Sequence, residues 1–522
     1  MLSGLDMVVA RTRHVKCDEG RPACNRCIRA KRTCEGYTAR TSSPQPSKEL
    51  LKFIVYSATA PSSGLSILPG ITPRQQRCFD FFRLRTAVEL AGPFEADLWS
   101  TVLLQTAHAE PAIINAVIAL GALHESFGYA QDAHAATSEY ALLHYGKAIQ
   151  RILTLNDSNL TLHMDIVLMA SIIFSAFESL RGHYKSALTH ISSGIDILIE
   201  TDKRSGGLRT GSVGKDVFVP MFVRLENQVI EVGQTASMKS SIKLLKRTLP
   251  SMPSTFKSVK EAHDAFDGFL SSLWHMLEPI KQESTSSPEP PGQQQRPSLA
   301  PLNSSMNPLE HFNSWCAAFE ASNFPPMHPA VLILQVHRTM LSTLLSVNIA
   351  LGETIWDPYL PQFQKLLDYA EKIPAPKAAG ASKQAHPVAT APYFAYHLGL
   401  LTPLYFTCTR CRDPTTRRRA LRMLENCYRK EGVWDSQLGT MAAKRIIQIE
   451  EMGAIETMKA SGFQPNFEGG WVVQTAEQVP ENARIRESDI SLGTGREGTI
   501  RYIRSGSGPS WKAEGKTERL VW

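Results

Sequence analysis

Residues 111–128 read PAIINAVIALGALHESFG, and their apolar side chains recur at spacings of three and four residues. This periodicity places the apolar side chains on one face of an α-helix, where they can pack against a core. Similar patterns lie on both sides of this stretch, over residues 79–90, 140–155, 160–180, 184–199, 217–230, 258–279, 309–319, 330–351, 414–430 and 435–458. The sequence therefore predicts a mostly α fold, with a large helical body over residues 75–460.

Three segments interrupt the helical pattern. Residues 38–74 are rich in Ser, Thr, Pro and Gly, which is typical of a linker. Residues 281–305, KQESTSSPEPPGQQQRPSLAPLNSS, contain too few apolar residues to form a core, so we expect a disordered surface loop there. The tail, residues 461–522, has strand-like runs at 471–473 and 500–503. We expect this tail to be irregular, with a short hairpin.

The composition shows where the charge lies. A chain of 522 residues is long enough for about two to four domains, and a hydrophobic content of 43% excludes general disorder. The net charge is only +7, but residues 1–48 hold ten Lys or Arg against four Asp or Glu. Nearly all of the excess charge therefore lies at the N-terminus, which suits a polyanionic partner.

The sequence predicts a soluble, intracellular protein without a membrane partner. The first 13 residues, MLSGLDMVVARTR, have only a brief apolar stretch and do not resemble a secretory signal. The best apolar run, residues 166–177, suits a buried helix and is too short to span a bilayer. An odd number of cysteines, nine, argues against a disulfide framework.

Four cysteines fall within eighteen residues near the N-terminus, in the pattern Cys17-x6-Cys24-x2-Cys27-x6-Cys34. Cysteines at such short spacings usually hold Zn²⁺ in tetrahedral geometry, and the metal supplies folding free energy that so small a segment lacks. Cations surround them, a combination that suits contacts with DNA phosphates and base edges: Arg11, Arg13, His14, Lys16, Arg26, Arg29, Lys31 and Arg32. The alternative is unliganded cysteines in a basic, disordered tail.

RTRHVKCDEGRPACNRCIRAKRTCEGY, residues 11–37, resembles the fungal binuclear zinc-cluster DNA-binding domain. In that family six cysteines bind two zinc ions, and the first and fourth bridge both metals. When the sequence is aligned with this pattern, the third to sixth family cysteines correspond to Cys17, Cys24, Cys27 and Cys34. The resemblance implies that Arg11, Arg13, His14 and Lys16 lie on the DNA-reading helix, while the later cations support it electrostatically.

The first two family cysteines should fall at positions 7 and 10, which are Met7 and Ala10. The chain as written is therefore expected to hold one zinc ion or none, where the complete family cluster holds two. The sequence agrees with the family pattern position by position from Arg11 onward and does not agree with it before that residue. We hypothesise that the natural protein carries the two missing cysteines just upstream of that residue.

The body carries a second resemblance, to the fungal-specific transcription factor domain found downstream of such clusters. The similar segments are ALGALHESFG (119–128), YALLHYGKAIQRIL (140–153), FESLRGHYKSALTHISSGIDILIE (177–200) and the region 403–451. The resemblance implies a helical regulatory domain that receives inputs and modulates the DNA-binding head. Its residues cover most of 75–510.

Possible enzyme motifs have simpler interpretations. Glu178, His183 and His190 suit pairing or packing between helices better than acid–base chemistry. Cys408-x2-Cys411 has no second pair nearby and precedes a helix start at 412–414, which indicates thiols near a helix junction. The glycines at 493, 495 and 498 match a dinucleotide fingerprint but precede strand-like TIRYIR, so a hairpin turn fits better. We predict that the protein is not an enzyme.

The sequence thus predicts a zinc-dependent, sequence-specific regulator of RNA polymerase II transcription in the nucleus. Its partners would be double-stranded DNA and the transcription machinery. It would bind DNA as a monomer or dimerise through the helical domain, since no heptad run indicates a coiled coil. Two alternatives stay open: a co-regulator with a broken cluster that acts through protein partners, and a helical protein that binds a small metabolite.

Overall fold

In the computed structural model the chain forms two compact units, Met1–Thr59 and Ala60–Trp522. The structure describes Arg29 of the first unit and, in the second, residues 70–94, 97–127, 131–155, 160–205, 215–231, 252–286, 308–348, 351–374, 392–462, 473–493, 497–505 and 515–522. The predicted mostly α fold is confirmed for the second unit, which also contains two small sheets. Residues 281–286, expected to begin a loop, continue a helix instead.

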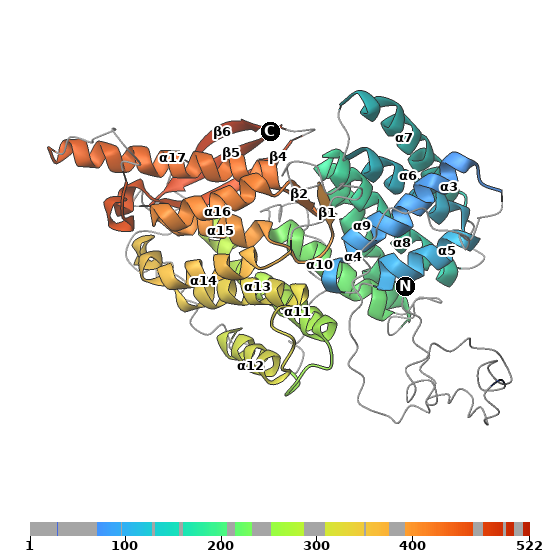
Figure 1. The fold of residues 1–522 in the computed structure, drawn as a ribbon, viewed down its shortest axis with the longest axis horizontal. Coiled ribbons are helices and arrows are strands. Elements are labelled where there is room, and N and C mark those ends of the chain that lie inside the picture. The colour runs from blue at the N-terminus through green and yellow to red at the C-terminus, as the bar shows by residue number, and fades with distance from the viewer. Residues whose placement is uncertain are drawn as a thin grey trace. The chain divides into compact units, whose positions relative to one another are not determined.

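The first half of the second unit is a group of helices around α6 (Pro111–Phe127). This helix packs along α3 (Pro73–Phe81), α7 (Gln131–Leu153) and α8 (Leu160–Arg181), and α8 packs along α9 (Tyr184–Ser205) (Figure 1). A Cβ on Gly121 would lie 2.3 Å from the Cys78 carbonyl oxygen, so this glycine permits the close approach of α3 and α6. Shorter segments complete the group: η1 (Phe82–Thr86), α4 (Ala87–Ala91), η2 (Gly92–Phe94), η3 (Leu98–Val102) and α5 (Leu103–Ala109).

Helix α8 is the most apolar of the long described helices. Its segment His163–Arg181 is long and apolar enough, by length and composition alone, to cross a membrane, and it contains the apolar run 166–177 that was expected to form a buried helix. The segment extends beyond that run because it also includes serines and the charged residues Asp165, Glu178 and Arg181. Because 83% of the segment is buried inside the protein, its apolar surface is covered by neighbouring helices.

The second half contains α10 (Lys215–Glu231), α11 (Val259–Ser286), α12 (Pro308–Ala321) and α13 (Pro329–Ser346). A separate aromatic core joins α11 to α12, where the Trp315 ring stacks on Phe319 at 4.9 Å and its Nε1 donates to the Ala262 carbonyl. Helix α13 ends at Ser346, five residues before its predicted end, because Val347 is extended. The remaining segments are η8 (Thr354–Tyr359), α14 (Leu360–Glu371), α15 (Leu401–Arg410), α16 (Pro414–Asn426) and α17 (Ser436–Ala460).

A three-stranded sheet lies within the helical body, where only helices were expected. Strand β1 (Tyr393–Ala395) pairs in parallel with β2 (Arg429–Glu431), which pairs antiparallel with β3 (Trp434–Asp435). The helix predicted over 414–430 therefore ends at Asn426. Lys430 is buried in β2 and donates to the carbonyls of Ser179 and Leu180 at the C-terminus of α8, a favourable place for a cation. This tertiary contact outweighs helix propensity.

The tail forms an antiparallel sheet of β4 (Ile485–Leu492), β5 (Glu497–Arg504) and β6 (Lys516–Val521). It lies beside α17, as Figure 1 shows. The strand expected at 500–503 is confirmed within β5, and so is the hairpin turn at the glycines, since the Gly493 amide donates to the Glu497 carbonyl. Of the strand expected at 471–473, the described residue, Val473, lies outside any strand. Two 3-10 segments, η9 (Ala476–Gln478) and η10 (Glu481–Ala483), precede the sheet.

A buried ionic network connects this sheet to the helices. Glu450 of α17 accepts hydrogen bonds from Arg412, from Arg417 and from the Ile485 amide at the start of β4. Arg412 also binds Glu353, close to η8. Burial alone would raise the pKa of Glu450, but Arg412 and Arg417 outweigh burial and hold this pKa at about 2. The carboxylate is therefore ionised at neutral pH.

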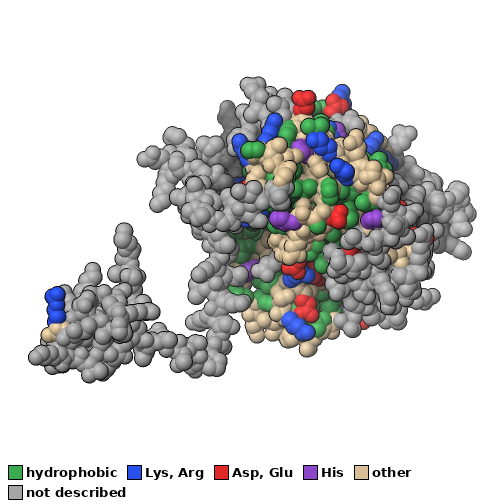
Figure 2. Space-filling view, turned by 90° about the vertical axis from the view of Figure 1, so that its right-hand side faces the viewer, with side chains coloured by type: hydrophobic (Ala, Val, Ile, Leu, Met, Phe, Trp, Pro, Cys, Tyr) green, Lys and Arg blue, Asp and Glu red, His purple; other side chains and the backbone are tan. Residues whose placement is uncertain are grey.

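The surface of the body shows no large single-sign field on the face drawn in Figure 2. There the described Lys, Arg, Asp and Glu side chains are interspersed with apolar ones. This agrees with the concentration of excess positive charge in residues 1–48.

Candidate functional site

Most of the residues predicted to bind zinc or DNA lie outside the part of the chain that the structure describes. These are the four cysteines and seven of the cations: Cys17, Cys24, Cys27, Cys34, Arg11, Arg13, His14, Lys16, Arg26, Lys31 and Arg32. Arg29 is described, and it is helical and exposed. Their roles therefore stay predictions.

The described body contains a buried polar cluster between α10 and α11. Arg224, Asn227 and Gln228 lie three and four positions apart, so they share one face of α10. Arg224 donates to Asp267 Oδ2 at 3.0 Å and to His263 Nδ1 at 3.1 Å. Asn227 donates to the Asp267 carbonyl. The two helices are thus joined by polar contacts inside an apolar core.

Burial sets the ionisation of this cluster. It lowers the pKa of His263 well below the usual range, and the Arg224 charge lowers it further, so the imidazole is neutral. Burial raises the pKa of Asp267 to about 6, although Arg224 opposes the rise. At neutral pH the aspartate is mostly ionised, and it forms a buried ion pair with Arg224.

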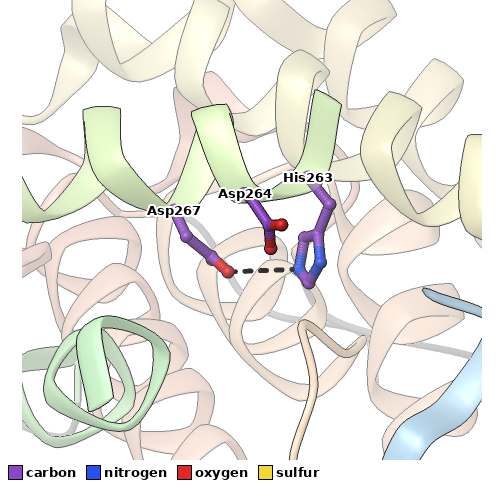
Figure 3. Close-up of side chains that lie close together, drawn as sticks. All are labelled: His263, Asp264 and Asp267. Atoms are coloured by element: carbon purple, nitrogen blue, oxygen red, sulfur yellow. Dashed lines mark ion pairs between the residues drawn. The ribbon is translucent and has the colours of Figure 1, made fainter. Parts of the chain in front are cut away.

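His263, Asp264 and Asp267 bring three potential metal ligands within 4.8 Å of one another, all from α11 (Figure 3). Arg224 already binds each of these residues, including Asp264 Oδ1 at 3.3 Å. A guanidinium therefore supplies the positive charge that a metal ion would otherwise bring. The cluster is an ion-pair network rather than a metal site.

A pocket borders this cluster. Its lining comes from α10, α11, α13, the segment between β1 and α15, the first turn of α15, and the small sheet: Arg224, Asn227, Gln228, Asp267, His337, His397, Leu398, Gly399, Thr402, Glu431 and Trp434. His337 Nε2 lies 2.6 Å from the Gly399 carbonyl. Glu431 accepts from the amides of Leu400 and Leu401, so it holds the segment that forms the pocket wall.

The structural interpretation of Glu178, His183 and His190 is confirmed. Glu178 pairs with Arg181 and with His183 Nδ1, both at 3.2 Å. His190 Nε2 lies 3.0 Å from the Tyr145 hydroxyl. These contacts join α8 to the turn that precedes α9 and join α7 to α9, and they account for all three side chains without a catalytic role.

Cys408 and Cys411 are free thiols at the junction between α15 and α16, as predicted. Both are buried, and burial raises the pKa of both thiols, that of Cys411 to about 12. They are therefore protonated at neutral pH. A protonated, buried thiol is a poor nucleophile and a poor metal ligand.

Comparison with known proteins supports both resemblances. Residues 11–44 match the fungal Zn(2)-Cys(6) binuclear cluster domain, and residues 79–225 match the fungal specific transcription factor domain. The chain is 26% identical over 599 aligned positions to the aspercryptin biosynthesis cluster-specific transcription regulator atnN of Emericella nidulans. That alignment covers 95% of this chain and 93% of the relative. The chain thus carries matches to the two domains of fungal zinc-cluster transcription regulators.

A second relative is the transcription regulator lscL of Purpureocillium lilacinum. It is 24% identical over 209 positions, which cover 37% of this chain and 48% of the relative. No solved structure matches the chain. The families and the relatives are transcription regulators, not enzymes, in agreement with the sequence-based prediction.

The polar pocket was not predicted from the sequence. One signal was present: Arg224, Asn227 and Gln228 are polar residues at spacings of three and four on helix α10. A second was the i, i+4 pair His263 and Asp267 on α11. Neither signal shows that the two stripes face each other, because α10 and α11 are separated by more than twenty residues.

Proposed function

We propose that the N-terminal segment of this regulator binds double-stranded DNA through a zinc-stapled head. The observation that carries the proposal is the coincidence of three features in residues 11–44: the family match, the four closely spaced cysteines and the cluster of cations. Arg11, Arg13, His14 and Lys16 would contact bases and phosphates, and Arg26, Arg29, Lys31 and Arg32 would add electrostatic attraction.

The donor set fits one zinc ion better than two. Cys17, Cys24, Cys27 and Cys34 supply the four thiolates of a tetrahedral site, whereas the family cluster shares six thiolates between two ions. When bound, zinc would fold the head. We propose that this chain as written holds at most one zinc ion and binds DNA less tightly than a form with both missing cysteines.

The target genes would lie in a biosynthetic gene cluster, and the protein would act in the nucleus. Support comes from the relative in Emericella nidulans, whose name describes a cluster-specific regulator and whose alignment spans nearly the whole chain. The helical body would modulate the head.

The proposal can be tested with a variant that restores the first two cysteines of the family pattern. Met7→Cys with Ala10→Cys re-creates the C-x2-C-x6-C pattern that leads into Cys17. Zinc per chain is measured by elemental analysis, and affinity for duplex DNA is measured at several salt concentrations. We expect at most one zinc on the parent chain, two on the double variant, and at least about tenfold tighter DNA binding by the variant.

The control is Cys27→Ser in the double variant, which should lose both zinc and DNA binding. Lys31→Ala should weaken binding to all sequences and reduce the salt slope by about 1. If the double variant binds no more zinc than the parent and neither binds DNA, the proposal fails. The replacement of two cysteines by Met7 and Ala10 would then favour a co-regulator that acts through other proteins.

A further inference from the structure

The second unit contains two large apolar clusters, and the neighbouring helices α10 and α11 lie in different ones. The buried apolar residues of α10 belong to the main cluster: Phe218, Met221, Phe222, Leu225 and Val229. Those of α11 belong to a second cluster, which also includes residues of α12 and α13: Ala262, Phe266, Phe269, Leu270 and Leu273. A boundary between the two clusters therefore runs between α10 and α11.

Polar side chains fill this boundary. Arg224 of α10 donates to Asp267 Oδ2 at 3.0 Å, and Asn227 donates to the Asp267 carbonyl at 2.9 Å. On α11, His263, Asp264 and Asp267 point to the same side of the helix (Figure 3). The exposed fractions of Arg224, His263 and Asp267 are only 6%, 0% and 1%. The polar layer, as we call this boundary, consists of Arg224, Asn227, Gln228, His263, Asp264 and Asp267.

The pocket described above continues the polar layer toward α13 and the small sheet. Gln228 Nε2 donates to the His397 carbonyl at 3.3 Å. His337 Nε2 of α13 lies 2.6 Å from the Gly399 carbonyl. Glu431 of β2 also lines the pocket. Polar groups therefore continue from α10 as far as β2.

Polar contacts hold a boundary closed less strongly than apolar packing does. The Arg224–Asp267 ion pair is buried, so loss of hydration offsets much of the attraction between the two charges. When α10 and α11 separate, these groups regain their hydration, whereas separation within either apolar cluster would expose apolar surface to water. An apolar contact that opposes the separation is the stack of Phe94 on His263, with ring centroids 3.8 Å apart. We expect the second unit to separate most readily at the polar layer.

Helix α13 is suited to be the pivot of such a movement because it belongs to both apolar clusters. Val336 and Met340 lie in the main cluster, whereas Leu334 and Leu341 lie in the second. Helices α11 and α12 are joined to each other by the second cluster (Figure 1). We propose that α11 and α12 swing away from α10 as one unit, along the polar layer and about α13, while the main apolar cluster stays folded.

This opening gives the helical body two conformational states. A regulatory domain needs such a pair of states, because a ligand or partner protein shifts their populations when it binds one state better than the other. The use of the opening in regulation rests on the proposed function of the body. The opening itself is independent of zinc and DNA, because the polar layer lies wholly within the second unit.

The test introduces a buried thiol beside the polar layer in the full chain. Ser271 lies on α11 four residues after Asp267, on the same face of the helix, and is 3% exposed. The rate at which a maleimide labels the Ser271→Cys thiol reports the opening, and mass spectrometry of peptides distinguishes this thiol from the native cysteines. Ser175→Cys is the matched control, because Ser175 is 0% exposed and lies on α8.

We expect the Ser271→Cys thiol to be labelled at least about tenfold faster than the Ser175→Cys thiol at pH 7. Its rate should also depend less on urea, because the opening exposes less surface than global unfolding does. Asp267→Asn breaks the ion pair and should accelerate the labelling of Ser271→Cys at least about tenfold. Glu450→Gln acts outside the polar layer, on Arg412 and Arg417, so it should accelerate only the labelling of Ser175→Cys.

Equal labelling rates with equal urea dependence for the two thiols would overturn the proposal, because the polar layer would then open only when the whole unit unfolds. An unchanged labelling rate in the Asp267→Asn variant would overturn it as well. So would an equal acceleration of both thiols by Glu450→Gln, since both would then be labelled through global unfolding.

Discussion

Glu450 contacts three separate parts of the chain, through Arg412, Arg417 and the Ile485 amide. Glu450→Gln keeps the shape of the side chain but leaves two buried arginines without a full counter-charge. We expect the free energy of unfolding to fall by about 3–5 kcal/mol, measured by urea denaturation at pH 7. The matched control is the next residue: Glu451 pairs with Arg418 at the partly exposed surface, so Glu451→Gln should cost less than about 1 kcal/mol.

The difference in stability between the parent protein and the Glu450→Gln variant should depend on pH. The pKa of Glu450 is lowered from 4.5 to about 2 in the folded protein. Its stabilising contribution is therefore fully present above pH 4.5 and is lost as the pH falls toward 2. The stability difference between the parent and Glu450→Gln should shrink over that range. A difference that stays constant between pH 5 and pH 3 would contradict the assignment of this carboxylate as ionised.

Buried histidines should make the protein less stable in mild acid. Burial lowers the pKa of His337 to about 4 and that of His397 to about 3. Because the unfolded chain takes up protons first, stability is lost as the pH falls from 6.5 toward these values, by up to about 1.4 kcal/mol per pH unit for each histidine. His337→Gln should reduce this slope in urea titrations at pH 7, 6 and 5. The same change at exposed His108 is the control.

At the scale of single elements, the start of α16 offers a direct test of helix capping. The Asp413 side chain accepts from the Thr416 amide at 2.7 Å, and Pro414 occupies the first turn. Asp413→Ala should lower the free energy of unfolding by about 1 kcal/mol, with a range of about 0.5–2. Asp413→Ser keeps a hydrogen-bond acceptor at the cap, so it should lower the free energy of unfolding by clearly less than Asp413→Ala does. Equal losses for the two variants in urea denaturation would show that the cap contributes little.

Elements with local signals were predictable, and elements built from distant partners were not. The start of α16 follows from its Asp-Pro pair, and α6, α8 and α9 follow from apolar periodicity. Strands β1 to β3 have only two or three residues each, too few for a recognisable pattern. Their stability comes from pairing across the chain and from Lys430 at the end of α8. Helices α14 and α15 are only 12 and 10 residues long and were also missed.

At the scale of the whole second unit, the tail is part of the core. Six side chains of the β4–β6 sheet belong to the main apolar cluster: Ile485, Ile490, Leu492, Ile500, Tyr502 and Leu520. At roughly 1.5–3 kcal/mol each, their burial is comparable to the whole stability of a typical domain. A chain that ends at Gly462 should therefore lose its cooperative thermal transition and become sensitive to protease. A truncated protein with the Tm of the full chain would contradict this.

The functional sites differ in how far the sequence predicts them. The N-terminal cysteines and cations are close together in sequence, so their spacing alone indicates zinc and DNA. The pocket combines Arg224 with Asp267, His337 and Glu431, and no local pattern shows that these residues meet. Such a site requires the tertiary structure, because each residue alone suits an ordinary buried position.

The wide separation of the pocket residues also determines when the pocket can form during synthesis on the ribosome. Arg224 leaves the ribosome about 200 residues before Trp434, a delay of roughly 10–40 s at ordinary translation rates. During that interval the polar face of α10 lacks the His397 carbonyl that later pairs with Gln228. The polar face of α10 must therefore stay in contact with water or with a chaperone until the second half of the body has been synthesised.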